Sequence, residues 1–139
     1  MKYALIALMA ITGVLAGSSP AIAHHGSATF DTGKEVVVEG SVTEWVWANP
    51  HCFLKFDVTG QDGAVRNWVV ETSAPPSMVA RGWSRRSFKV GETVTVTVEP
   101  VKNGNPIGRL LQVKLANGQV LSASDSAEPA EGVQGSPGE

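Results

Sequence analysis

Residues 74–88 read APPSMVARGWSRRSF, and this stretch decides how the chain folds. Its two adjacent prolines suit the first turn of a helix, where a missing amide hydrogen costs nothing, and Gly82 suits the end of that helix. We therefore predict a short helix at about Ser77 to Arg81, and a second turn that starts at Ser84. The segments on both sides are rich in valine, threonine and tryptophan, which is the composition of β-strands.

Three predicted strands precede this helix and two follow it. The clearest is TVTVTVEPV, 93–101, whose strict alternation is typical of a half-buried strand. Gly40 interrupts the longest strand, which suggests a bend or bulge there. The predicted strands are 35–47, 51–58, 65–72, 93–101 and 108–115, and a turn at Asn117-Gly118 allows a short terminal pairing by 119–122.

An order of three strands, a helix and two strands matches the OB-fold. We therefore predict an all-β, OB-like five-stranded Greek-key barrel with a short helix between strands 3 and 4. A plain β-sandwich is the alternative, but it needs more strands than the sequence offers. In OB-folds, ligands gather on the face of strands two and three and on two flanking loops. Those loops correspond here to residues 48–51 and 102–108.

The first 23 residues have the pattern of a signal peptide. A lysine is followed by a short apolar run and by Ala21-Ile22-Ala23, a small-x-small cleavage pattern. The run is shorter than the roughly 20 residues that cross a bilayer. We therefore expect a mature chain that starts at His24, has no membrane span and resides in a bacterial periplasm.

The mature chain is long enough for one domain. We predict an OB-like domain at 24–121, which begins with an N-terminal arm (24–34), and a disordered acidic tail at 122–139. The whole chain carries 11 basic and 13 acidic residues, a formal net charge of −2, and no basic stripe. This distribution argues against a nucleic-acid partner.

Cleavage after Ala23 would give His24 a free α-amino group. An amine and an imidazole on one residue close a chelate ring, and the amide and ring of His25 are close by. Both the amine, with an ordinary pKa of about 8, and the imidazole, near about 6.5, lose their protons to a metal around neutral pH. If the arm crosses the barrel mouth, His51 could complete the site and Asp31 could add a carboxylate. Nitrogen ligands without sulfur suit Cu(II), Ni(II) or Zn(II).

The simpler interpretations of the histidines stay open. N-terminal residues are often disordered, and two polar residues after a cleavage site can serve only to keep it accessible. His51 follows Asn-Pro at the start of a strand, where its ring can hydrogen-bond the loop and hold it shut.

Alternation along 51–58 assigns two faces. Cys52 falls on the apolar face, so it is expected to be a buried small hydrophobic residue that forms no disulfide, because it is the only cysteine. His51 and Phe53 fall on the outer face.

Two tryptophans lie just before the first predicted loop. Strict alternation places Trp45 and Trp47 on the face opposite Val42, so at least one could be partly exposed near His51. With Asn49 and Phe53 they could form an aromatic surface that binds a ligand. The simpler interpretation is that each tryptophan covers the end of the barrel as part of the core.

Several catalytic signatures are absent from the sequence. It contains no His-Glu-x-x-His, no Gly-x-Ser-x-Gly and no glycine-rich phosphate loop. Glu44 and Glu71 are isolated carboxylates on strands, so no acid–base pair is evident. We do not predict an enzyme.

A set of short elements is spread over about residues 24–121. These elements are His24-His25, Phe30-Asp31, Gly40-x-Val42, Asn49-Pro50-His51, Trp68-x-x-Glu71, Ser73-x-Pro75, Gly82-Trp83, Gly91-Glu92-x-Val94 and Lys102-Asn103-Gly104. In these elements the chain resembles a family of small exported bacterial proteins of unknown function, DUF6152. The resemblance implies a signal peptide and a His-His pair at the mature start, it links the three histidines as a set, and it implies no activity.

Two functions therefore compete. The first is a periplasmic module that carries or buffers a transition metal, copper foremost, through its N-terminal histidines. The second is a metal-free accessory module that uses its aromatic surface and the loops 48–51 and 102–108 to bind a small ligand or a partner protein.

Overall fold

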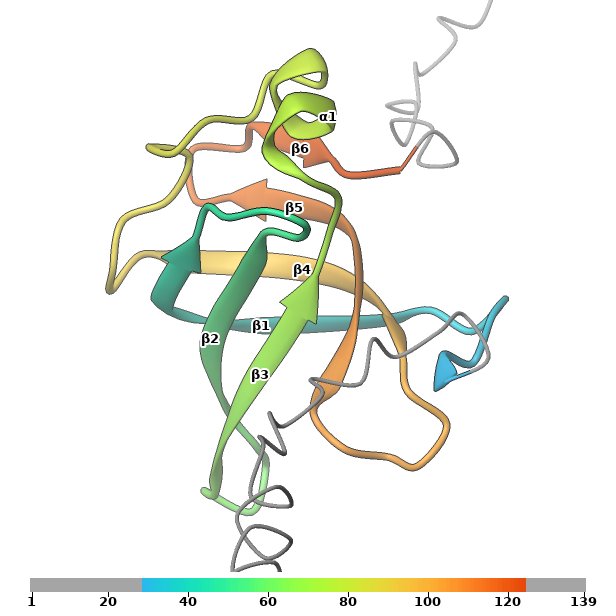
Figure 1. The fold of residues 1–139 in the computed structure, drawn as a ribbon. Helices are drawn as coiled ribbons and strands as arrows, with labels where there is room; N and C mark the ends of the chain where they lie inside the picture. The colour runs from blue at the N-terminus through green and yellow to red at the C-terminus, as the bar shows by residue number, and fades with distance from the viewer. Residues whose placement is uncertain (1–28, 125–139) are drawn as a thin grey trace, which may run out of the picture.

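A six-stranded sheet curls around until two of its strands, β3 and β5, meet (Figure 1). The computed structural model describes residues 29–124. Between these limits the elements are β1 (Val36–Val46), β2 (Phe53–Thr59), β3 (Val65–Glu71), α1 (Pro75–Ala80), β4 (Thr93–Pro100), β5 (Ile107–Leu115) and β6 (Val120–Ser122).

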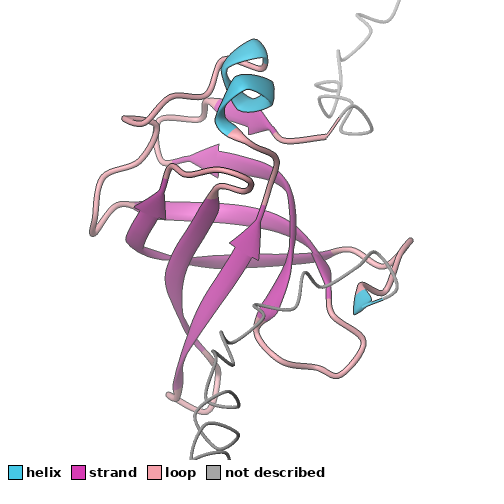
Figure 2. Ribbon diagram, viewed as in Figure 1, coloured by secondary structure: helices cyan, strands magenta, loops and turns pink. Residues whose placement is uncertain are grey.

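The β3–β5 pairing closes the barrel. The other neighbouring strands pair antiparallel in the order β3-β2-β1-β4-β5-β6, whereas β3 and β5 run parallel over three residue pairs, from Val69–Ile107 to Glu71–Arg109. Five strands thus form a closed barrel, to which β6 is added at the edge of β5. Figure 2 shows the short helix α1 at one end of this barrel, and α1 lies between β3 and β4 in the chain. The predicted OB-like barrel is confirmed.

The predicted strands are all present, with ends that differ by a residue or two. The helix starts two residues earlier than the predicted Ser77, and the two prolines occupy its first turn. The folded part continues past the predicted limit at residue 121: β6 includes Ser122, and the amide of Ala123 donates a hydrogen bond of 2.8 Å to Leu111. The predicted signal peptide and cleavage site, His24, His25 and tail residues 125–139 lie outside the described residues.

One prediction about the first strand is wrong, and a β-bulge explains why. Val42 pairs with Phe56 whereas Glu44 pairs with Lys55, so β1 has one extra residue between them. A single extra residue reverses the alternation beyond it. Trp45 therefore packs against the core on the same side as Val42, rather than on the opposite face.

The bulge that was predicted at Gly40 lies further along the strand. Gly40 has a different role. A Cβ atom at Gly40 would collide with the backbone oxygen of Asp57 and would approach the Phe56 ring to 2.9 Å. Glycine is therefore needed where β1 crosses β2 at close range.

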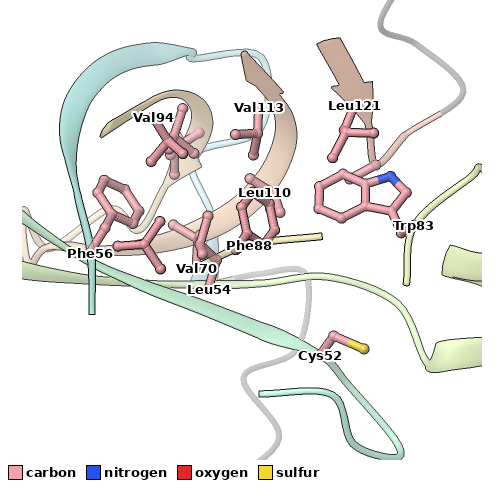
Figure 3. Close-up of a cluster of buried hydrophobic side chains, with 14 of the residues drawn as sticks. Cys52, Leu54, Phe56, Val70, Trp83, Phe88, Val94, Leu110, Val113 and Leu121 are labelled. Atoms are coloured by element: carbon pink, nitrogen blue, oxygen red, sulfur yellow. The ribbon is translucent and has the colours of Figure 1, made fainter. Parts of the chain in front are cut away.

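Apolar side chains from all five barrel strands fill the interior, and Figure 3 shows them meeting with Trp83 on one side of the cluster. Trp83 is 2% exposed, and its indole Nε1–H donates a hydrogen bond of 2.8 Å to the carbonyl of Ser122. The residue after α1 thus closes the core and also holds β6. Trp45 contacts the same group, with ring centroids 5.8 Å from Trp83 and 5.1 Å from Phe88.

Cys52 is fully buried, as predicted from the alternation. Burial raises the pKa of its thiol, while the nearby carbonyl of Ala48 and the charge of Arg85 oppose this effect. Both the burial and the protonated state make this sulfur unreactive. Within residues 29–124, no helix is long and apolar enough to cross a membrane.

We expect Gly40→Ala to destabilise the protein by roughly 1–3 kcal/mol, the usual cost of overpacking a tight site. The matched control is Val37→Ala in the same strand, where the side chain is 66% exposed and the cost should stay below about 0.5 kcal/mol. Urea unfolding of both variants measures the difference. Equal stability of the two variants would contradict the close strand crossing.

A thiol reagent should modify Cys52 only when the domain opens. We expect the folded protein to react at least ~100-fold more slowly than the protein in denaturant, because each 1.4 kcal/mol of opening free energy gives about a tenfold change. A colorimetric thiol assay at neutral pH measures both rates. Similar rates in the two conditions would mean that Cys52 is accessible in the folded state.

Candidate functional site

His51 is the described residue on which the predicted metal site depends, and a backbone contact orients its ring. The ring atom Nδ1 lies 2.9 Å from the carbonyl oxygen of Thr72, just past the end of β3. A carbonyl accepts hydrogen bonds only, so Nδ1 carries the proton and donates it. The contact ties the β1–β2 loop, which contains a cis Asn49–Pro50 peptide bond, to β3. The predicted loop-holding hydrogen bond of His51 is therefore present.

The fixed tautomer determines what His51 offers chemically. With the proton on Nδ1, the lone pair of the ring is on Nε2. Metal-bound histidines commonly have this arrangement, in which one ring nitrogen donates to a backbone carbonyl and the other binds the ion. The Thr72 contact thus serves a structural role and is also compatible with a ligand role.

A cavity of about 260 Å³ opens beside His51. It lies between the end of β3, the middle of β5 and the segment after β6. Its lining includes the hydroxyl-bearing Ser124, whose Oγ is buried and has no hydrogen-bond partner in the structure. A buried hydroxyl without a partner is unfavourable, so the cavity is suited to a polar occupant. The lining residues are His51, Glu71, Thr72, Ser73, Arg109, Leu110, Ala123 and Ser124.

A second, smaller cavity of about 160 Å³ adjoins the same strands. Its walls are mainly apolar and include Phe30, Phe53 and Ile107. Glu71 lines both cavities, so its side chain lies at their junction. Both cavities follow the β3–β5 seam, and the smaller one reaches the start of β5, where the predicted loop 102–108 ends.

Arg109 lines the larger cavity and is held by contacts with Glu99 and Phe30. Its guanidinium Nη1 lies 3.0 Å from Oε2 of Glu99, which is only 9% exposed, and its Cζ lies 4.7 Å from the centre of the Phe30 ring. The Glu99 contact is an ion pair without hydrogen-bond alignment. Arg109 therefore links the N-terminal segment to the barrel through a cation–π contact and an ion pair.

Backbone contacts fix the start of the described chain. Phe30 forms an isolated antiparallel bridge with Val101, and Phe30 itself is 2% exposed. The amide of Asp31 donates to Pro100 at 2.8 Å, and the amide of Lys102 donates to Thr29 at 3.1 Å. The predicted arm is thus anchored beside the loop between β4 and β5 as far back as Thr29.

The predicted metal ligands are only partly within the described structure. His24 and His25 lie outside the described residues. Asp31 lies in the turn after Phe30 and lines neither cavity, whereas His51 lines the larger one. Among residues 29–124, no group of three or more histidine, cysteine or carboxylate side chains could hold a metal ion.

The residues of the predicted aromatic surface fall into two groups. Trp45 packs with Trp83 and Phe88, and Trp47, with its ring centroid 5.7 Å from that of Trp45, also packs against the core. Phe53 instead neighbours His51, at 6.4 Å between ring centroids. Asn49 is exposed in the loop between β1 and β2. The tryptophans thus take the core role that was the simpler interpretation, and Phe53 alone of the aromatic set lines a cavity described above.

Sequence reasoning missed Glu71 and Arg109 as neighbours. The tight turn between β2 and β3 fixes the pairing of Glu71 with Phe53, so that contact could have been found from the hairpin. The pairing of Glu71 with Arg109 depends on barrel closure between distant strands. No local signal in the sequence sets that register.

Comparison with known proteins identifies a family but no activity. No curated protein and no solved structure gives a significant match to the chain. The model of a family of unknown function, DUF6152, matches residues 10–110, which is most of the chain and includes His24, His25, His51, Glu71 and the beginning of β5. The chain therefore belongs to the DUF6152 family.

Proposed function

We propose that this protein is an exported, periplasmic binding module that carries or buffers a transition metal, with copper(II) the leading candidate, through His24, His25 and His51. The observation that carries the proposal is the hydrogen bond from Nδ1 of His51 to the carbonyl of Thr72. It fixes the ring so that Nε2 has the lone pair, at the edge of a cavity with both polar and apolar walls.

The short segment before Thr29 supports a site shared between the N-terminal histidines and His51. Phe30 and Phe53 line one cavity, and the Phe53 ring is 6.4 Å from the His51 ring. His24 precedes Thr29 by five residues. At about 3.3–3.6 Å per extended residue, that length spans up to about 17 Å. The terminus of a chain cut after Ala23 could therefore reach barrel groups within about that distance of Thr29.

The buried cysteine favours metals that accept nitrogen ligands. Cys52 is enclosed in the core with the pKa of its thiol raised, so its sulfur does not compete as a ligand. The proposed donors are then a terminal amine and imidazole nitrogens. Such sets suit Cu(II), Ni(II) and Zn(II), and among these Cu(II) forms the most stable complexes.

A metal-free ligand-binding module is the second candidate, and the two cavities favour it. Their volumes of about 260 and 160 Å³ are small compared with the roughly 300–1,000 Å³ of drug-sized sites, so the ligand would be small. The mixed walls offer Phe53 for apolar contact and Arg109 and Ser124 for polar contact. In this second function, a partner protein would bind the surface near Trp45 and Trp47.

We expect a chain that starts at His24 with a free amine to bind Cu(II) much more tightly than the same chain acetylated at that amine. Acetylation removes the amine as a ligand and breaks the chelate, so affinity should fall by on the order of 100-fold or more, above the range for loss of an outer contact. Competition titration against a copper chelator measures both affinities. Equal, weak binding by the two chains would favour the metal-free module.

The second test separates the two roles of His51. His51→Asn places an amide N–H near the position of Nδ1, so the bond to Thr72 is kept while Nε2 is lost. We expect unchanged thermal unfolding of the metal-free protein and a fall of about 10- to 100-fold in Cu(II) affinity. If His51→Asn binds Cu(II) as the parent does, the ring only holds the loop.

A further inference from the structure

Glu71 has an unusual environment for a carboxylate within a barrel wall. It ends β3, where Val70 beside it is fully buried and points inward, so Glu71 points outward. Its side chain is half-buried and lines both cavities. Within residues 29–124, its carboxylate takes part in no hydrogen bond or ion pair. A half-buried carboxylate without a partner loses hydration and gains nothing in return.

The nearest cation in the register does not neutralise it. Arg109 is directly opposite Glu71 across the β3–β5 seam, but its guanidinium pairs with Glu99 and stacks on Phe30. Glu99 balances the charge of Arg109, so Glu71 is left without an ion-pair partner among residues 29–124. Glu71 can therefore supply a negative charge that attracts a cation.

Glu71 and His51 are held by the same piece of backbone. The carbonyl that orients His51 belongs to Thr72, the residue directly after Glu71. Both side chains line the 260 Å³ cavity, together with the unsatisfied hydroxyl of Ser124. One imidazole Nε2 and one carboxylate are a common ligand pair for Cu(II) and Zn(II), and the hydroxyl could receive a hydrogen bond from or donate one to a metal-bound water.

Asp31 fits this position less well. Its backbone is tied to Pro100 in the turn that follows Phe30, and it lines neither cavity. The sequence singled out Asp31 because it lies near the N-terminal histidines in the chain. Barrel closure instead places Glu71 with His51.

We infer that Glu71 is the carboxylate ligand of the metal, and that Glu71 and His51 form the half of the site that the barrel supplies. The inference rests on the proposed function, since the N-terminal amine and imidazole of His24 supply the other half. Glu71 thus replaces Asp31 in the predicted ligand set.

The test compares four chains that start at His24. Three have a free amine there: the parent, Glu71→Gln and Asp31→Asn. The fourth is the parent acetylated at that amine. Cu(II) alone is the probe, in competition with a chelator. Both substitutions remove one negative charge and keep the size of the side chain, so Asp31→Asn controls for the general loss of charge. We expect Glu71→Gln to weaken binding by about tenfold or more and Asp31→Asn by less than about twofold.

The outcomes separate this inference from the proposed function. Equal affinities of Glu71→Gln and Asp31→Asn would overturn the role of Glu71. The acetylated chain then reports independently on the N-terminal site: a loss of Cu(II) affinity there keeps the proposed function, and no loss removes it. Thermal unfolding without metal checks that Glu71→Gln is folded. If it is not, Glu71→Asp keeps the charge but shortens the reach, and parent-like binding by that variant would also count against the inference.

Discussion

The parallel pairing of β3 with β5 is the constraint on which the rest of the structure depends. It has only three residue pairs, yet it turns an open sheet into a closed barrel. Gly108 permits the close approach of β4 and β5 beside this seam, because a Cβ there would lie 2.6 Å from the oxygen of Glu99. Closure also brings the end of β3 next to β5, so Glu71 and Arg109 become neighbours. The candidate site is therefore a product of the barrel's topology rather than of any one loop.

The sequence predicted the strands and the helix well, and it predicted the contacts between them less well. Alternation in β4 and the proline–glycine pattern around α1 predicted the strand order and the helix, because both signals are local. Alternation also predicted the burial of Cys52. It failed at Trp45, because one extra residue in β1 reverses the faces beyond it and no residue type marks that position.

The site shows the same division between local and distant signals. The position of His51 at the start of a strand suggested the loop-holding hydrogen bond that the structure contains. Glu71 seemed isolated because its neighbours across the seam, Arg109 and the cavity walls, come from the far end of the chain. Contacts between distant strands depend on register, which a short motif does not set. Only the folded barrel shows that His51 and Glu71 line the same cavity.

The anchoring of Thr29 and Phe30 has a consequence for any group carried by the preceding residues. In a chain cut after Ala23, as proposed, five residues would join the terminus to the anchored Thr29. Its encounter with the barrel surface would then be intramolecular, and short tethers of this kind give effective concentrations in the millimolar range. Cooperation between the two ends of such a site is then determined by tether length. Insertions or deletions before Thr29 would change this cooperation without altering any contact in the barrel.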